Sequence, residues 1–215
     1  MFENFGWENL RPLLDGMRLT IFLVVASGFF GTVMGFFLGL ARTAPSRFAR
    51  APSAVYVGFI RGQPVLIILF FVYFVAPLMF PAASFSRGVT AVAGLSFYAA
   101  AYIAEIVRGS VLAVPTGQSE AAQALGMNYR LRLRYVVLPQ ALRIAVPPGI
   151  GFLVALVKAT SLTSVIGYVE LTRAGRITIT INQEPIATFL IVAVLYFVVC
   201  FPISLVGRWY ERRLA

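Results

Sequence analysis

Long apolar segments alternate with short polar segments along most of this chain. Five of the apolar segments are close to or above the roughly 20 residues that a helix needs to cross a bilayer. We therefore expect membrane-spanning helices at about residues 16–41, 54–79, 88–114, 144–167 and 185–206. Backbone polar groups find no water inside a bilayer, and helices satisfy these groups internally. The pattern predicts an all-α integral membrane protein with no separate soluble domain.

Three of the expected spans contain residues that affect helix geometry. The run Arg61-Gly62-Gln63-Pro64 should interrupt or bend the second span, and Pro147-Pro148-Gly149 should distort the fourth. Glycines recur every three or four residues in the first span, so one face of that helix can approach another helix closely. These glycines are Gly28, Gly31, Gly35 and Gly39.

The polar segments outside the spans differ in character. Residues 1–15 are amphipathic, and we interpret them as an interfacial segment with Trp7 at the level of the lipid headgroups. Residues 168–184 form a polar region with two glutamates and two arginines. Residues 115–143 form a polar loop that contains the longest clearly polar passage of the chain, residues 117–127.

This polar passage predicts a short helix from Gln118 to Leu125. Glu120 is expected in its first turn, where a carboxylate complements the positive end of the helix dipole. The alanine-rich middle favours a helix, and Gly126 provides a C-terminal stop. A helix of about two turns is marginal in water by itself. We therefore expect it to pack against another surface, which its small alanine side chains allow to come close.

The distribution of arginines predicts the orientation of the spans. Residues 42–50, 114–143 and the C-terminal tail together hold ten arginines, whereas the segments on the opposite side hold five. Positively charged segments flanking membrane spans are retained on the cytoplasmic side. We therefore expect an external N-terminus and a cytoplasmic C-terminus, with the 115–143 loop in the cytoplasm.

The composition excludes several classes of protein. The hydrophobic fraction is 60%, above the 45–50% that is typical of soluble domains. The net charge of +10 comes from basic residues beside apolar spans, which indicates contacts with membrane lipid and not with nucleic acid. Absence of histidine excludes a His-based metal site or catalytic triad, and Cys200 is the lone cysteine. The chain has no Gly-rich phosphate loop ending in Gly-Lys-Ser/Thr, so it is not itself an ATPase.

The central polar helix carries a specific resemblance. Glu120-Ala121-Ala122, followed by Gly126 and then by Leu138-Pro139, resembles the EAA loop in membrane subunits of ABC importers. The resemblance implies a coupling helix that docks into a groove on a cytoplasmic ATPase; the plain alternative is a surface helix between two spans. The residues that this resemblance marks for ATPase coupling are Gln118, Glu120, Ala121, Ala122, Leu125, Gly126 and Met127.

Most of the chain from about Gly16 onward resembles the branch of these permeases that serves polar amino acids, namely histidine, glutamate, glutamine, arginine and opines. Two positions depart from the pattern of the branch. Gln63 replaces the more usual Thr of Arg-Gly-Thr-Pro, and Ala159 stands where Asp or Asn is common. The matching stretches are residues 16–20, 56–64, 101–109, 115–126 and 158–162.

The resemblance implies a complete transport machine. We expect the five-helix fold of a type I ABC importer permease in the bacterial inner membrane. Its partners would be a second permease chain, identical or homologous, two cytoplasmic ABC ATPase subunits and an external amino acid-binding protein. ATP and Mg would be used by the partner ATPase, and no cofactor is expected in this chain.

Ionisable residues inside the spans are candidates for the substrate pathway, because a charge in the bilayer is costly unless it meets a partner or a cavity. Glu105 and Arg108 lie three residues apart on one helix face, so they either pair with each other or act in gating or substrate contact. Lys158 either pairs with a carboxylate such as Glu105 or faces the pathway and meets a substrate carboxylate.

Three further residues complete the expected pathway. Thr160 and Ser161 could add hydroxyl contacts, although such hydroxyls often bond to their own helix backbone. Arg61 is expected near the cytoplasmic edge, either as a helix-end anchor or as part of the pathway. Glu105 and Lys158 together could hold the ammonium and the carboxylate of a free amino acid.

Two other classes of function compete with the importer permease. A membrane enzyme would need a catalytic constellation, but the chain offers no histidine and no closely spaced acidic pair. An ATP-independent amino acid carrier or channel would explain the spans but would leave the Glu120 helix without a role. Co-purification of an ATPase distinguishes the importer from the carrier.

Overall fold

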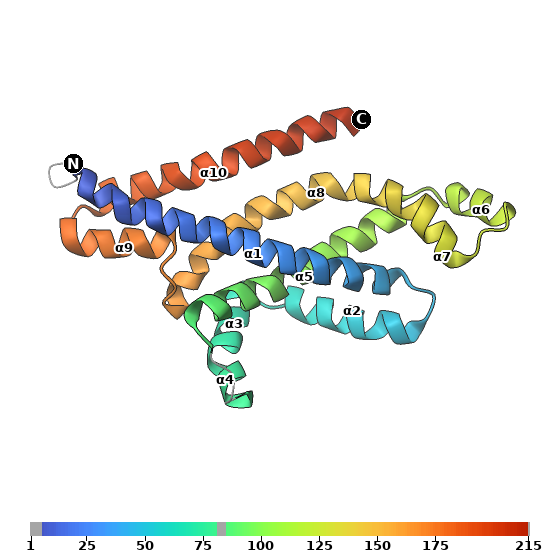
Figure 1. Cartoon of the computed structure of the whole chain (residues 1–215), viewed down its shortest axis with the longest axis horizontal. Helices are drawn as coiled ribbons and strands as arrows, with labels where there is room; N and C mark the ends of the chain where they lie inside the picture. The colour runs from blue at the N-terminus through green and yellow to red at the C-terminus, as the bar shows by residue number, and fades with distance from the viewer. Residues whose placement is uncertain (1–5, 81–84, 215) are drawn as a thin grey trace.

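The computed structural model describes residues 6–80 and 85–214, and all regular elements within them are helical (Figure 1). Residues 1–5 of the expected interfacial segment, and 81–84 in the loop after the second span, lie outside the described part. The long helices are α1 (Leu10–Thr43), α5 (Arg87–Ala113), α8 (Leu138–Ala159) and α10 (Pro185–Leu214). The shorter α-helices are α2 (Arg47–Arg61), α3 (Val65–Phe70), α4 (Ala76–Met79), α6 (Thr116–Ala124), α7 (Tyr129–Arg132) and α9 (Leu171–Asn182). The remaining helical turns are η1 (Trp7–Asn9), η2 (Phe71–Val75), η3 (Leu133–Val137) and η4 (Thr160–Ile166).

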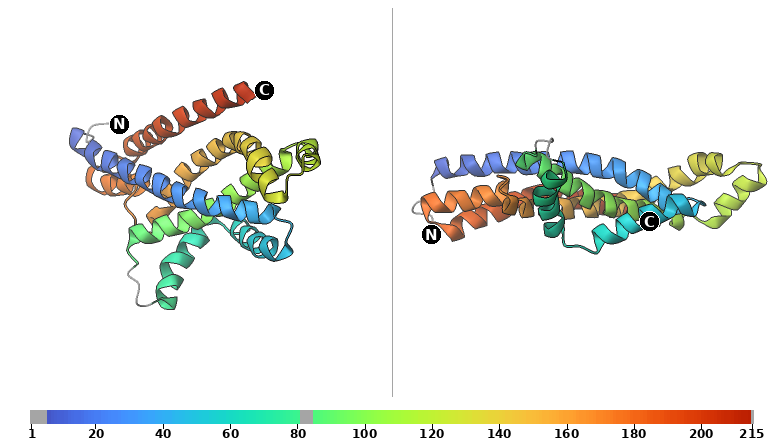
Figure 2. Two further views of the ribbon diagram at one scale, coloured as in Figure 1. Left: turned by 45° about the vertical axis from the view of Figure 1, so that its right-hand side comes forward. Right: turned by 90° about the horizontal axis from the view of Figure 1, so that it is seen from below.

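Four helical segments are long and apolar enough to cross a membrane, and a bent pair of shorter segments makes a fifth. The four are Trp7–Thr43, Arg87–Ala113, Tyr129–Ile166 and Pro185–Arg213. The fifth consists of Arg47–Arg61 and Val65–Met79, whose axes differ by 106°. The all-helical membrane class with up to five spans is therefore confirmed. Seen edge-on, the helices form a shallow layer, and α6 and α7 project from one narrow end (Figure 2).

Helices α1 and α5 run parallel and pack with their backbones nearly in contact. A Cβ atom added to Gly35 would lie 2.7 Å from the carbonyl oxygen of Ala100. One added to Gly39 would lie 2.7 Å from the carbonyl oxygen of Ala104. Close backbone approach gains van der Waals contact, which drives helix association where water is absent. Three glycines of the predicted small-residue face, Gly31, Gly35 and Gly39, thus pack on α5, whereas Gly28 faces Leu156 of α8.

The core of the bundle lies where α1, α3, α5 and α8 meet. Leu23, Leu69, Leu95 and Leu156 come from these four helices and are buried together. Helix α10 packs on α8 and α9 along one side only, and most of its length is exposed in this single chain (Figure 1). The exposed surface of α10 is apolar along most of the helix, so lipid or another protein chain must surround it.

The second expected span is sharply bent, as predicted from the Gly-Gln-Pro run. Helix α2 ends at Arg61, and Pro64 caps the start of α3. Proline cannot donate a backbone hydrogen bond and restricts the residue before it to extended backbone, so the helix cannot continue through this point. Helix α2 is held against α1 by the Ser53 hydroxyl, which donates to the Leu38 carbonyl oxygen at 2.8 Å.

The fourth span differs from the expectation in two respects. Helix α8 continues through Pro147 and Pro148 without a break. The helical run also begins at Tyr129, so half of the loop expected at 115–143 belongs to the span. Arginine side chains have long apolar stems, so a basic helix start can lie at a membrane surface with its charges in water.

The polar region expected at 168–184 is largely a helix, α9, which lies beside the N-terminal part of α1 (Figure 1). The Glu170 carboxylate caps it by accepting hydrogen bonds from the backbone N–H groups of Thr172, at 2.8 Å, and Arg173, at 2.9 Å. Its inner face buries Leu171, Ala174 and Thr178 at helical spacing. Similarly, the segment expected at 1–15 is helical from Leu10 onward as the first turns of α1.

Candidate functional site

Helix α6 is the short polar helix that the sequence predicts at the centre of the chain, and it ends in a complete hydrogen-bonded cap. Gly126 adopts a left-handed conformation with φ of 78°. The Met127 N–H donates to the Ala122 carbonyl at 3.1 Å, and the Gly126 N–H donates to the Gln123 carbonyl at 2.9 Å. This pair of bonds is the Schellman motif, in which glycine avoids the strain that a Cβ would cause. The helix end is therefore specified by the sequence.

The two faces of α6 differ in exposure. Ala122 is buried against the η3 segment. Glu120, Ala121 and Leu125 are exposed, and the Leu125 side chain is 80% exposed. The side of α6 that faces away from η3 therefore presents a carboxylate, a small side chain and an apolar side chain.

The position of Glu120 in the helix corrects one prediction. Helix α6 begins at Thr116 with Pro115 as its N-cap, two residues earlier than expected. Glu120 is therefore in the second turn, and no acidic residue lies in the first turn. The dipole argument for Glu120 is wrong, because Pro115 is extended and allows the helix to start immediately after it. Glu120 is available on the exposed surface instead.

Hydrogen bonds hold α6 to the helical run that follows it. Arg132 Nη1 donates to Gln123 Oε1 at 3.0 Å, and Gln140 Nε2 lies 3.4 Å from Gln118 Oε1. The Asn128 side chain caps α7 by accepting from the Leu131 N–H at 3.0 Å. These contacts attach α6 to the start of the fourth spanning segment.

Glu105 on α5 is surrounded by arginines from three helices. Arg108 Nε donates to it at 3.0 Å from one turn further along α5. Arg42, from the last turn of α1, also donates to its carboxylate. Arg61 Nη1, from the end of α2, lies 3.5 Å from it. The Glu105 carboxylate is thus an ion-pair centre that connects α1, α2 and α5.

Arg61, at the C-terminal end of α2, lies close to Glu105 and to Arg42, which contacts the same carboxylate oxygen. Helix α2 returns along α1, so Arg61 lies about 21 Å from Arg47 at the other end of the helix, given a rise of 1.5 Å per residue. Its guanidinium is 5.3 Å from the centre of the Tyr102 ring, a cation–π distance. The Arg61 charge is therefore stabilised by Glu105 and by this ring. Its position relative to the membrane edge stays a prediction.

Lys158, Thr160 and Ser161 lie at the junction of α8 and η4 in different environments. Lys158 is exposed, and it forms no ion pair within residues 6–80 and 85–214. Thr160 is fully buried and donates to the Val157 carbonyl at 2.7 Å, whereas Ser161 is half-buried and donates to the Lys158 carbonyl at 2.7 Å. The structure does not bring Lys158 and Glu105 into an ion pair.

Sequence reasoning missed a buried polar cluster around Glu170. Tyr196 of α10 donates a hydrogen bond to its carboxylate at 2.9 Å, and Thr172 Oγ lies 3.0 Å from the Tyr196 hydroxyl. Burial raises the pKa of the Glu170 carboxyl above its usual range, and the hydrogen bonds that it accepts oppose this rise. The N-cap position of Glu170 before a helix-periodic apolar pattern was the available signal.

A bundle of apolar spanning helices with a short polar helix at one end defines a polytopic membrane protein. The family described as "Binding-protein-dependent transport system inner membrane component" matches residues 31–215, and the chain belongs to this family. The prediction of an ABC importer permease from the amino acid branch is thereby confirmed, together with its multi-pass location in the inner membrane.

Relatives of similar length support this assignment. The chain is 36% identical to the glutamine transport system permease protein GlnP of Escherichia coli strain K12, over 98% of both proteins. It is 38% identical to the L-cystine transport system permease protein TcyB of Bacillus subtilis strain 168, over 96% of this chain and 88% of TcyB.

Solved structures show the same fold. A crystal structure of an amino acid ABC transporter with histidines matches with a TM-score of 0.88 and 30% identity, covering 96% of this chain and 95% of the other. An inward-facing structure of the MetNI methionine ABC transporter matches with a TM-score of 0.83 and 26% identity, covering 98% of this chain and 100% of the other. The type I importer permease fold is therefore confirmed.

Proposed function

We propose that this chain forms the membrane pathway of an importer for polar amino acids and that α6 is its coupling helix. The observation that carries the proposal is the geometry of α6, which buries Ala122 and is held to the following helical run by the Arg132–Gln123 hydrogen bond. Its opposite face, with Glu120, Ala121 and Leu125, is exposed for docking. Gln118, at the start of the helix, and Met127, just after it, flank this surface.

The proposed function requires an ATPase, a second permease chain and a binding protein as partners. One ATPase subunit docks on each α6 of a pair of permease chains, identical or homologous, and this subunit uses ATP and Mg. The chain itself has no phosphate-binding loop and acts as the conduit, not the enzyme. An external amino acid-binding protein delivers substrate at the opposite face of the membrane.

We infer that the chain is oriented in the membrane with α6 on the cytoplasmic side. This orientation is supported by the excess of arginines in the loop after α1, in the segment around α6 and α7, and in the C-terminal tail. Five crossings then put the N-terminus outside and the C-terminus in the cytoplasm. This arrangement also places α9 on the external side, where the binding protein approaches.

The substrate contacts divide between two groups of the candidate residues. Lys158 is exposed in the single chain and suits the carboxylate of an amino acid, with Ser161 beside it. Glu105 is occupied by Arg42, Arg61 and Arg108, so it serves in gating and not as the ammonium partner. Thr160 supports the backbone at this point, since it is buried and bonded to its own helix.

The test of coupling is a pair of substitutions at one position. Gly126→Val places a β-branched residue in a left-handed conformation, whereas Gly126→Asn places a residue that tolerates it. The complex is reconstituted in liposomes with the ATPase and binding protein encoded with it, and ATP hydrolysis is measured against a panel of amino acids. We expect stimulation by one class of amino acid in the wild type and the Asn variant, and its loss in the Val variant.

A carrier that works without ATP is the competing function. Uptake that persists without any associated ATPase, and that is equal in the two Gly126 variants, would contradict the coupling role of α6. The substrate panel also identifies the amino acid class, because the hydrolysis rate rises only with the transported substrate.

A further inference from the structure

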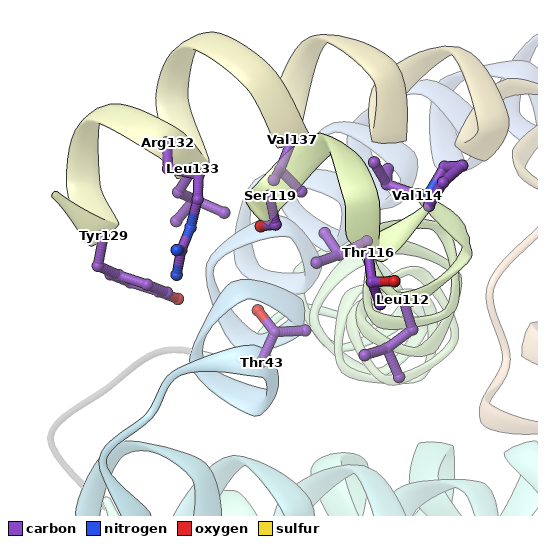
Figure 3. A pocket seen from close by; sticks show the side chains of 11 residues that line it. Thr43, Leu112, Val114, Thr116, Ser119, Tyr129, Arg132, Leu133 and Val137 are labelled. Carbon is purple, nitrogen blue, oxygen red and sulfur yellow. The ribbon is translucent and has the colours of Figure 1, made fainter. Parts of the chain in front are cut away.

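A cleft of about 200 Å³ lies behind α6, between this helix and the membrane bundle (Figure 3). It is bounded by the ends of α1 and α5 on one side and by the α7–η3 segment on the other. This is not the exposed face proposed for ATPase docking, because the cleft opens between α6 and its own chain. The cleft has a polar part, which includes Arg132 and Ser119, and an apolar part, which includes Leu133 and Val137.

The polar part of the cleft contains an arginine without a carboxylate partner. Arg132 is half-buried, and no acidic residue in the described part of the chain pairs with it. One of its N–H groups donates to Gln123, and a guanidinium carries five such donors. Figure 3 shows Tyr129 beside Arg132, with Thr43 and Ser119 on the opposite helices of the same cleft.

The surroundings of the cleft raise its positive potential. Arg130 and Arg134 flank Arg132 in the sequence, and both are exposed. Glu120, the acidic residue of α6, does not line the cleft. An oxyanion bound at Arg132 therefore meets guanidinium and hydroxyl groups without a nearby lining carboxylate.

The cleft lies where a spanning helix begins. Tyr129 is the first residue of the spanning segment Tyr129–Ile166, and arginines alternate with apolar and aromatic residues over its first two turns. Such a pattern is typical of the headgroup level of a membrane. Beyond the polar groups, the cleft is lined by Leu112, Leu133 and Val137, which suit an acyl chain.

We propose that this cleft binds one anionic phospholipid, with its headgroup phosphate at Arg132 and the start of an acyl chain along the apolar wall. The chemistry is recognition of a phosphate oxyanion by guanidinium and hydroxyl donors. Basic pockets between helices on the cytoplasmic side are suited to acidic headgroups. The bound lipid would fill the space between α6 and the bundle and so fix the position of the coupling helix. The inference rests on the proposed function only for the cytoplasmic placement of α6.

The experiment counts retained lipid on the intact permease–ATPase complex. The complex is reconstituted in nanodiscs of phosphatidylcholine with a minor fraction of phosphatidylglycerol, and native mass spectrometry measures the phosphatidylglycerol that stays bound. Arg132→Gln removes the proposed phosphate ligand, and Arg130→Gln is the matched control, with the same loss of charge two residues away. Ser119→Phe fills the cleft without changing the charge.

We expect Arg130→Gln to lower phosphatidylglycerol retention by no more than about fivefold, because it removes one surrounding charge, worth roughly 1 kcal/mol, but not the proposed phosphate ligand. Arg132→Gln should retain phosphatidylglycerol well over tenfold less, because it removes a hydrogen bond to a charged group, worth about 1.5–3 kcal/mol, in addition to the charge. Ser119→Phe should retain as little as Arg132→Gln, and this variant keeps the test decisive if Arg132→Gln fails to assemble. Equal retention by Ser119→Phe and the wild type would overturn the proposal.

A second arm separates a lipid from a soluble phosphate. Glycerol 3-phosphate is added to complexes in pure phosphatidylcholine nanodiscs. We expect no Arg132-dependent binding, because this probe lacks the acyl chain; binding that depends on Arg132 would overturn the lipid assignment. The measurement of retained lipid does not depend on transport activity. A wild-type complex that binds phosphatidylglycerol but transports no amino acid would therefore contradict the proposed function and leave the lipid site supported.

Discussion

Arg108 Nε donates a hydrogen bond of 3.0 Å to Glu105 Oε1, one turn away on α5. This local pair is what the sequence spacing indicates, but it is only part of the arrangement. Arg42 and Arg61 reach the other carboxylate oxygen from α1 and α2. One carboxylate therefore compensates charges on three helices.

The first prediction concerns this ion-pair centre. Glu105→Gln leaves three guanidinium groups without their carboxylate, and we expect the free energy of unfolding to fall by about 2 kcal/mol. This value lies between the small effect of an exposed pair and the 3–5 kcal/mol of a buried one, in keeping with the partial burial of the site. Thermal unfolding of the purified chain in detergent measures the change. Glu120→Gln, at an exposed carboxylate, is the control and should leave Tm nearly unchanged.

The second prediction concerns the contact between α1 and α5. Gly35→Ala places a methyl group 2.7 Å from the Ala100 carbonyl oxygen, so the two helices must separate. We expect a loss of about 1–3 kcal/mol, typical of overpacking. Gly58→Ala is the matched control, because a Cβ at Gly58 meets no atom within 4 Å. Equal Tm values for the two variants would show that the close packing is not required.

The third prediction concerns pH. The folded chain raises the pKa of the Glu170 carboxyl, so it binds this proton more tightly than the unfolded chain does. The resulting stabilisation is fully present below the unfolded pKa and is lost as the pH rises through the folded pKa. Relative to Glu170→Gln, whose side chain does not titrate, the wild type should therefore lose stability with rising pH across the acid range. A Tm difference that does not vary with pH would contradict this prediction.

The fourth prediction concerns substrate recognition. Lys158→Met removes the proposed partner of the substrate carboxylate, and Lys158→Arg retains the charge. A hydrogen bond to a charged group contributes about 1.5–3 kcal/mol, so the Met variant should transport at least about tenfold more slowly at saturating binding protein. The Arg variant should keep most of the rate. Uptake of radiolabelled amino acid by proteoliposomes gives both rates, and wild-type transport by the Met variant would exclude Lys158 from the pathway.

The structural features that could be predicted from the sequence are those that depend on residues close together in the chain. The apolar segments indicated the helical membrane class, the spacing of Gly31 to Gly39 indicated a close-packing face, and Gly126 indicated the end of α6. Each of these features depends on residues within a few turns of one another. The bend after Arg61 belongs to the same group, because Pro64 acts on its own backbone.

Features that depend on tertiary contacts could not be predicted in this way. Glu105 was recognised as a charge that needs a partner, but two of its three partners come from helices far away in the sequence. The cluster of Glu170 with Tyr196 is of the same kind, since 26 residues separate them. Helix α9 was missed because its polar residues outweighed its helix-periodic buried face.

The glycine contact between α1 and α5 also determines how far a local displacement can travel. Helix α6 is connected to α5 through Val114 and Pro115 alone, so a shift of α6 acts directly on the end of α5. The backbones of α1 and α5 are nearly in contact, so we expect a shift of α5 to displace α1 with it. Because α1 is 34 residues long, about 51 Å, we expect a displacement at one of its ends to be carried to the other end.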